Sequence, residues 1–211
     1  ESCAMKLSDL PRALDIKADR IRKKLSAELS GRIRSFCRGR GVTEAVVFES
    51  AVLLYLARVN PENRTCTIGL PVLNRKRLQE KRTAGMFIST MPLKIDMDAS
   101  ETAGGLLKKV TAAKREMFRH QKYPYEEILR AVRNDHGFTG NLFDVMVSVQ
   151  DNQIHGENGY QTKWYSNGYN EVPFVLSVDQ RDSRGQYALT ADYQTAAFPD
   201  EAEAYAVLER L

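Results

Sequence analysis

The sequence predicts an α/β fold in which a mixed β-sheet is covered by helices on at least one face. Residues 87–97 and 142–150 alternate apolar and polar side chains with the period of two that is typical of half-buried strands. Residues 43–59 and 101–120 instead repeat apolar side chains at helical spacing. Because strands and helices are interspersed along the chain, these elements predict a sheet packed against helices.

The first third of the chain is predicted to hold a lead-in, a strand and two helices. Residues 1–18 have little periodicity and contain Pro11, which predicts an extended lead-in or linker. Residues 19–25 are predicted to form a short strand with one solvent-exposed face. A helix with Cys37 on its apolar face should end at Gly39 or Gly41. Thr43 is a plausible N-cap for the next, deeply buried helix, which Asn60-Pro61 should stop near residue 59.

The middle of the chain contains the clearest strand. Residues 65–72 are predicted to form a strand whose Gly69 and Pro71 mark a bulge or a sheet edge. A charged loop, 74–82, follows. In the strand 87–97, one face is predicted to carry Phe87, Ser89, Met91, Leu93, Ile95 and Met97.

The remaining elements are predicted from breakers and alternation. The helix 101–120 should break at Tyr123-Pro124, and a second helix should run to about residue 133. In strand 142–150, one side should carry Phe143, Val145, Val147 and Val149. Residues 151–170 are expected to form a loop with a short strand. Residues 172–178 and 187–193 suit a hairpin through 182–185, and Pro199 should open a final helix, 200–211.

Composition is typical of an ordinary globular protein and argues against several classes of partner. Of the 211 residues, 43% are hydrophobic and 27% are charged, without the run of ~18 apolar residues that a membrane span needs. The net charge of +4 is spread over several segments without interleaved aromatics, so we expect no nucleic acid partner. Cys3, Cys37 and Cys66 match neither a disulfide framework nor a zinc pattern. Reduced thiols and the lack of a leader segment predict a cytoplasmic protein.

No set of catalytic or metal-binding residues emerges from spacing alone. His120, His136 and His155 are far apart, and none pairs with another at a metal-ligand spacing. His120 precedes a helix break, where a hydrogen-bonded structural role is the more common one. Neither a nucleophile elbow nor a phosphate-binding glycine loop is present. Spacing therefore gives no candidate catalytic set, and we expect no metal site in this chain.

Four stretches, in order, resemble late core motifs of the condensation domains of nonribosomal peptide synthetases. Residues 68–75, IGLPVLNR, resemble the family's IGxPVxNR segment, and residues 85–93, GMFISTMPL, resemble its GMFVNTLPL strand. Residues 120–126, HQKYPYE, are similar to HQDYPFE, and residues 142–150, LFDVMVSVQ, are similar to LFDVMFSLQ. The sequence departs from the family pattern at two places: Ser89 stands where the family usually has Asn, and residues 133–142 replace its RDxSRNPL stretch.

This resemblance implies that residues 19–211 form the C-terminal lobe of the two-lobed, chloramphenicol-acetyltransferase-like fold of CoA-dependent acyltransferases. The family's HHxxxDG motif belongs to the N-terminal lobe and does not occur in this sequence. The expected reaction is amide formation between two carrier-bound phosphopantetheine thioesters, in peptide antibiotic or siderophore biosynthesis, and this lobe alone should be inactive. The implied partners are the N-terminal lobe, peptidyl or aminoacyl carrier domains and an adenylation domain. No cofactor should bind this chain directly.

By the same resemblance, this lobe supplies one wall of a substrate tunnel. The candidate tunnel residues are Gly85, Phe87, Ser89, Met91, Ser148 and Gln150. Strand parity motivates Ser89, Ser148 and Gln150, which could equally be sheet residues packed under a helix. Loop 74–82 is similar to the tunnel floor, and residues 151–170 to the segment that crosses to the other lobe. The candidate structural residues of the motifs are Asn74, Arg75, His120, Pro124, Glu126 and Arg133.

Two other functions stay open. The chain could be a lobe of an epimerization domain that acts on a carrier-bound amino acid. Epimerization domains share this fold, but the ending of the strand motif at residues 91–93 favours condensation. It could also be a non-catalytic docking module for carrier proteins. Tight binding of a phosphopantetheinylated carrier by this chain alone would favour the docking module.

Overall fold

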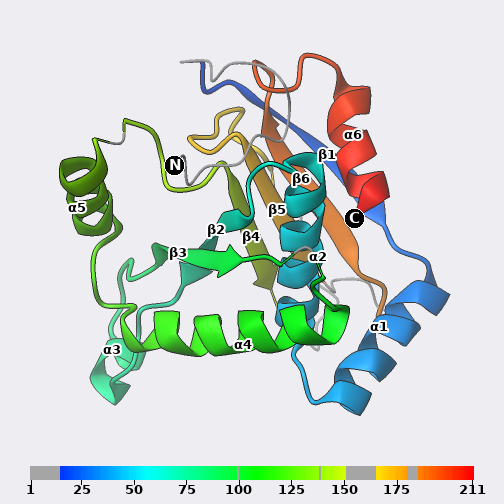
Figure 1. The fold of residues 1–211 in the computed structure, drawn as a ribbon, viewed down its shortest axis with the longest axis horizontal. Helices are drawn as coiled ribbons and strands as arrows, with labels where there is room; N and C mark the ends of the chain where they lie inside the picture. The colour runs from blue at the N-terminus through cyan, green and yellow to red at the C-terminus, as the bar shows by residue number, and fades with distance from the viewer. Residues whose placement is uncertain (1–14, 99, 138, 151–164, 180–184) are drawn as a thin grey trace.

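The structure, a computed structural model, describes residues 15–98, 100–137, 139–150, 165–179 and 185–211 (Figure 1). The strands are β1 (Ala18–Lys24), β2 (Thr65–Val72), β3 (Ser89–Asp96), β4 (Val145–Gln150), β5 (Phe174–Asp179) and β6 (Ala188–Gln194). The helices are α1 (Ala27–Arg40), α2 (Glu44–Val59), α3 (Leu78–Arg82), α4 (Ala103–Arg119), α5 (Tyr125–His136) and α6 (Glu201–Arg210). The predicted strand before residue 170 lies largely outside the described residues, as does most of the loop between β5 and β6.

The six described strands form one mixed sheet in the order β1-β6-β5-β4-β2-β3. Strand β4 runs parallel to both β2 and β5, whereas the pairs β2–β3, β5–β6 and β1–β6 are antiparallel. The mixed sheet predicted from the sequence is thus confirmed. Strands β1 and β3, which are separated by much of the chain, form the two edges.

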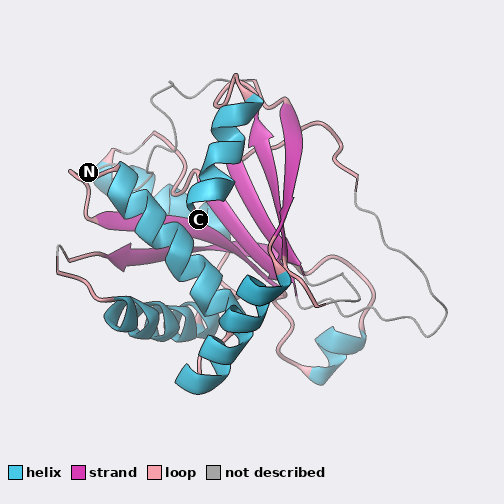
Figure 2. Ribbon diagram, turned by 90° about the vertical axis from the view of Figure 1, so that its right-hand side faces the viewer, coloured by secondary structure: helices cyan, strands magenta, loops and turns pink. Residues whose placement is uncertain are grey.

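The main core lies between one face of the sheet and the helices α2, α4 and α6, and Figure 2 shows most of the helical chain on one side of the strands. Side chains of alternate strand residues point into it, such as Leu93 of β3 and Val147 of β4, each 1% exposed. Helix α2 crosses this face with Leu53 and Leu56 fully buried. The all-round apolar pattern of α2 is therefore explained by burial against both the sheet and α4.

The ends of the helices follow the signals in the sequence. The Thr43 hydroxyl accepts the N–H of Val46 at 3.3 Å and caps α2. Helix α1 ends at Gly41, whose φ of 64° is the left-handed conformation that glycine adopts at low cost. Helix α6 begins after its cap Asp200, which accepts the N–H of Ala202 at 2.9 Å.

Four predictions on the β2–β3–β4 region were wrong in detail. Strand β2 lies inside the sheet, so Gly69 marks no edge: an added Cβ would lie 2.4 Å from the Phe143 ring. Strand β3 begins only at Ser89, because Arg75 holds the preceding residues in a loop. The predicted charged loop contains the short helix α3. Phe143 precedes β4 and packs in a second apolar cluster with Leu129 and Leu142, apart from Val145 and Val147.

Candidate functional site

The loop between β2 and β3, residues 73–88, is held by many side-chain hydrogen bonds. It begins at Asn74, whose φ of 54° is the only positive value at a described residue other than glycine. The Arg75 guanidinium donates to three carbonyl oxygens of the loop, those of Glu80, Thr83 at 2.6 Å and Gly85 at 2.7 Å. It also stacks on the Phe87 ring, 4.0 Å from the ring centre. Arg75 therefore holds the loop folded back on itself.

Gly85 has a backbone conformation that favours glycine. Its φ of 140° is one that residues with a Cβ rarely adopt. This conformation turns its carbonyl oxygen toward Arg75 and leads the chain into Phe87 and Ser89. The motif residues Gly85 and Arg75 are thus parts of one turn.

Glu80 of α3 lies at the centre of this loop. One carboxylate oxygen accepts the backbone N–H groups of Lys76 at 2.7 Å and Arg77 at 2.9 Å, and the other accepts the Lys122 ammonium at 2.9 Å. The N–H of Arg77, the ammonium of Lys122 and the N–H of Lys76 together lower the pKa of Glu80 to about 2. Glu80 is therefore a fully ionised acceptor at neutral pH.

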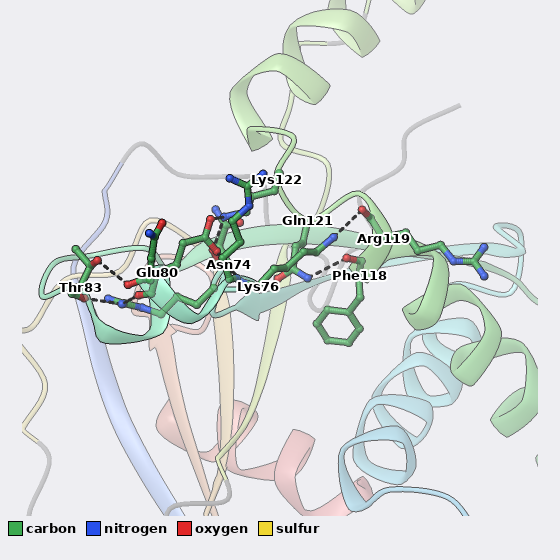
Figure 3. Close-up of polar contacts among 11 residues, drawn as sticks. Asn74, Lys76, Glu80, Thr83, Phe118, Arg119, Gln121 and Lys122 are labelled. Carbon is green, nitrogen blue, oxygen red and sulfur yellow. Dashed lines mark hydrogen bonds and ion pairs between the residues drawn. The ribbon is translucent and has the colours of Figure 1, made fainter.

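The α4–α5 turn, residues 120–124, lies against this loop, and Figure 3 shows the contacts between them. Lys122 also donates to the carbonyl oxygen of Asn74 at 2.8 Å, and Lys76 donates to the carbonyl oxygen of Arg119 at 3.0 Å. Gln121 caps the same helix end by donating to the carbonyl oxygen of Phe118 at 2.9 Å. The IGLPVLNR and HQKYPYE segments, more than 40 residues apart in sequence, thus form one site.

The other motif residues have structural positions. The His120 ring nitrogen Nε2 lies 3.1 Å from Glu116 Oε1 on an exposed helix end. Pro124 is the N-cap residue of α5, and Glu126 lies in that helix's first turn, where a negative charge is favourable. Arg133 donates to the carbonyl oxygen of Gly140 at 3.4 Å, near the end of α5.

The candidate tunnel residues fall into two groups on opposite faces of the sheet. Ser89 lies opposite Val72 at the start of β3 and shares the core face with Met91, which is 4% exposed. Ser148 and Gln150 of β4 alternate with the buried Val147 and therefore face the other way. Gly85 and Phe87 thus belong to loop 73–88, Ser89 is the first residue of β3, and Met91 is a core residue.

On the face opposite the core, Ser148 belongs to a row of polar residues that sequence reasoning missed. Ser148 lies opposite Ser177 of β5, and Ser177 lies opposite Thr190 of β6. Beyond them Asp192 of β6 pairs with Arg20 of β1, with 2.6 Å between the nearest charged atoms. The alternation of residues 174–178 and 187–193 could have placed Ser177 and Thr190 on this face, but not next to Ser148, because strand order is not visible in the sequence.

Gln150 lies at the end of β4, beside a cavity of about 690 Å³ between the sheet, the end of α1 and the start of α2. The cavity is lined by Arg34, Arg38, Thr43, Gln150, Asp179 and Tyr187, among others. Arg34 donates to the carbonyl oxygen of Gly185 and stacks on the Tyr187 ring. Gln150 therefore lies where the two central parallel strands end, next to both cationic and acidic side chains.

The thiols of the described chain are poor nucleophiles. Burial raises the pKa of the Cys66 thiol to about 12 and also raises that of Cys37. Cys3 and His155 lie outside the described residues, and His136 is exposed at the end of α5. Within the described ranges, no three His, Cys, Asp or Glu side chains are grouped so as to hold a metal ion.

A membrane span needs a helix that is both long and apolar, and the described helices are shorter or more polar than that.

Comparisons with known proteins agree on one family. The family model described as "Condensation domain" matches residues 6–211. Surfactin synthase subunit 1 of Bacillus subtilis (strain 168) is 30% identical over 200 residues, which are 93% of this chain and 6% of that protein. Malpinin synthetase of Mortierella alpina is 25% identical over 191 residues, which are 89% of this chain and 2% of that protein. This chain thus spans a small part of the proteins that it matches.

Solved structures show the same fold. The first condensation domain of the CDA synthetase superposes with a TM-score of 0.80 at 16% identity, over 98% of this chain and 45% of that chain. A four-domain nonribosomal peptide synthetase bound to AMP and glycine gives a TM-score of 0.81 at 17% identity, over 98% of this chain and 17% of that chain. With this fold and the family match over nearly its whole length, the chain belongs to the condensation domain family of nonribosomal peptide synthetases.

Proposed function

We propose that this chain is the C-terminal lobe of a condensation domain that joins two carrier-bound substrates through an amide bond. The family match supports the reaction class. The chain aligns over 98% of its own length but only 45% of a solved condensation domain, which supports its assignment to one of two lobes. The proposal depends most on this difference between the aligned fraction of this chain and that of the solved domain.

In the proposed reaction, the amine of one substrate attacks the thioester carbonyl carbon of the other. The new C–N bond forms as the C–S bond breaks, and the amine's proton ends on the departing phosphopantetheine thiol. Both thioesters are carried by phosphopantetheine arms of carrier domains. This chain would contribute by holding amine and carbonyl together, so that proximity replaces a bimolecular collision.

The described residues offer no well-placed base for this step. His120 is exposed and paired with Glu116. His136 is exposed at the end of α5, and the two buried thiols have raised pKa values. We therefore propose that the histidine of an HHxxxDG motif on the other lobe acts on the reacting amine, and that this lobe alone is inactive.

The polar row on the open face supports Ser148 and Gln150 as tunnel residues. Both are partly exposed, and with Ser177 and Thr190 they give four neighbouring polar side chains on one face of the sheet. Hydroxyl and amide groups suit the amides of a phosphopantetheine arm, because each can donate and accept. Loop 74–82 would form the tunnel floor, and Gly85, Phe87 and Ser89 follow it along the chain.

Alanine substitution in the complete condensation domain tests this role. Ser148→Ala should lower kcat/KM for amide formation about fivefold, the effect of losing one neutral hydrogen bond in the transition state. Ser35→Ala, on an exposed position of α1, is the matched control and should leave it unchanged. An unchanged rate in Ser148→Ala, with normal folding, would remove Ser148 from the tunnel.

The amide assay and a carrier-binding measurement together separate the two alternative functions. An epimerization domain would invert the α-carbon of a carrier-bound amino acid and form no amide. A docking module would bind a phosphopantetheinylated carrier tightly as the 211-residue chain alone. The family match supports amide formation over both.

A further inference from the structure

Three hydrogen bonds, all from lysine ammonium groups, hold loop 73–88 against the end of α4 and the α4–α5 turn. Two come from Lys122, to Asn74 O at 2.8 Å and to Glu80 Oε1 at 2.9 Å. The third comes from Lys76, to Arg119 O at 3.0 Å. Lys122 is the only one of these donors that reaches both the first residue of the loop's turn and its helix α3.

The backbone of the loop holds the carboxylate of Glu80 independently of Lys122. The backbone N–H groups of Lys76 and Arg77 both bind Glu80 Oε2, which leaves Oε1 facing the α4–α5 turn. The Glu80 side chain is 22% exposed and that of Lys122 is 45% exposed. A carboxylate held by two backbone donors loses little conformational freedom when it binds a third, so this pair is better organised than a typical surface ion pair.

The sign of the charge at position 122 matters for this geometry. Both groups that the Lys122 ammonium contacts, a carbonyl oxygen and a carboxylate oxygen, are acceptors. A neutral side chain would leave them without this donor, and a carboxylate, such as the Asp of the HQDYPFE motif, would repel them. Position 122 therefore needs a donor, and a cation suits the two acceptors best as long as Glu80 occupies its present place.

A change in this contact would reach the residues proposed to border the substrate. Arg75 binds the carbonyl oxygens of Glu80 and Gly85 with the same guanidinium group, so α3 and the entry to β3 move together. Phe87 lies under that guanidinium. The path from the α4–α5 turn to Phe87 thus runs through three side chains, Lys122, Glu80 and Arg75, and the backbone of α3.

We infer that Lys122 and Glu80 are a matched pair of positioning residues, which hold loop 73–88 against the α4–α5 turn and so set the place of Gly85 and Phe87 for amide formation. This inference rests on the proposed function. Neither residue touches the reacting atoms. Their role is to keep the loop in one position while substrates enter and leave.

Hydrogen exchange in the 211-residue chain tests the contact without any assay of activity. Lys122→Met should speed exchange of the Lys76 and Arg77 amides about threefold, because it removes the donor that closes the loop against the turn. Lys122→Arg should keep the slow exchange of the unmodified chain, since a guanidinium can still donate to both acceptors. Arg130→Met, which breaks an exposed pair with Glu127 within α5, is the control and should change neither amide.

Amide formation by the complete condensation domain tests the positioning role. Lys122→Met should lower kcat roughly tenfold with little change in KM for the carrier-bound substrates, and Lys122→Arg should restore kcat. Unchanged exchange in Lys122→Met would overturn the inference, and so would faster exchange with an unchanged kcat. If the unmodified domain forms no amide, the proposed function fails, whereas the exchange comparison still decides whether the pair holds the loop.

Discussion

The Arg75 guanidinium carbon lies 4.0 Å from the centre of the Phe87 ring, and the same group donates to the carbonyl oxygens of Thr83 and Gly85. Planar stacking and forked donation occur together only with arginine, because a lysine ammonium is neither planar nor forked. One side chain therefore decides the shape of the segment that leads into β3.

Arg75→Lys should lower the free energy of unfolding by about 1–2 kcal/mol, because two charge-assisted hydrogen bonds and the stacking are lost at a partly exposed site. Urea denaturation of the 211-residue chain measures the change. Arg130→Lys, at an exposed position of α5, serves as the comparison and should be neutral. An equal effect of the two substitutions would contradict the role of Arg75.

Gly69→Ala should destabilise the chain by about 1–3 kcal/mol, because the new Cβ would lie 2.4 Å from an atom of the Phe143 ring in a packed cluster. Gly104→Ala meets nothing within 4 Å in the first turn of α4 and should be neutral or stabilising. Adding Phe143→Leu to Gly69→Ala should recover part of the loss. Thermal unfolding of the four proteins measures these differences, and equal Tm values for the two alanine variants would count against the packing described.

The pair of Glu49 and Lys114 joins α2 to α4 with 2.7 Å between nitrogen and oxygen, and burial raises the pKa of Glu49 despite the lysine. A raised folded-state pKa means that the unfolded chain releases this proton first as pH rises. The contribution of Glu49 to the free energy of unfolding is therefore fully present below about pH 4.5, the ordinary pKa of Glu. It falls as the pH rises from there toward the pKa of Glu49 in the folded chain.

Glu49→Gln should remove this pH dependence. The free energy of unfolding of the unmodified chain, minus that of Glu49→Gln, should therefore decrease as pH rises above about 4.5. Lys114→Met leaves the buried carboxylate without its partner and should cost roughly 2–4 kcal/mol at neutral pH. Denaturation curves recorded at roughly every pH unit from about pH 4 to pH 8, which spans this window, measure both effects. A difference that grows with pH would show that Lys114 outweighs burial.

Glu80 should have the opposite pH dependence. Its folded pKa is lowered to about 2 by the N–H of Arg77, Lys122 and the N–H of Lys76, from an ordinary value of 4.5. Its contribution to stability is therefore complete above 4.5 and is lost as pH falls toward 2. NMR titration of the Glu80 carboxyl carbon measures this pKa, and Lys122→Met should raise it. A value that does not change in Lys122→Met would mean that the backbone donors alone hold the carboxylate.

The sequence predicted most of the elements because their signals are local. The alternation of Met91, Leu93 and Ile95 is visible within one strand, and the Thr43 cap precedes its helix directly. Helix α3 was not predicted because five residues are too few to display the periodicity of a helix. Phe143 was placed on the wrong side because alternation was extended past the start of β4.

The site was less predictable because its contacts join distant segments. Resemblance identified Arg75 and Gly85 as members of two separate motifs, but their shared hydrogen bond depends on how the chain turns at Asn74. Nothing local indicates that Lys122 reaches Glu80, 42 residues away in sequence. Likewise Ser148 and Ser177 become neighbours only through the parallel pairing of β4 and β5.

The central claim is that this chain is one lobe of an amide-forming domain, and reconstitution tests it most directly. The 211-residue chain is mixed with the HHxxxDG-bearing lobe of the same synthetase and with two carrier proteins loaded with aminoacyl thioesters. Mass spectrometry of the carrier-bound products then detects the amide. We expect amide formation only when both lobes are present. Amide formation by this chain alone, or none by an intact domain that contains it, would contradict the account.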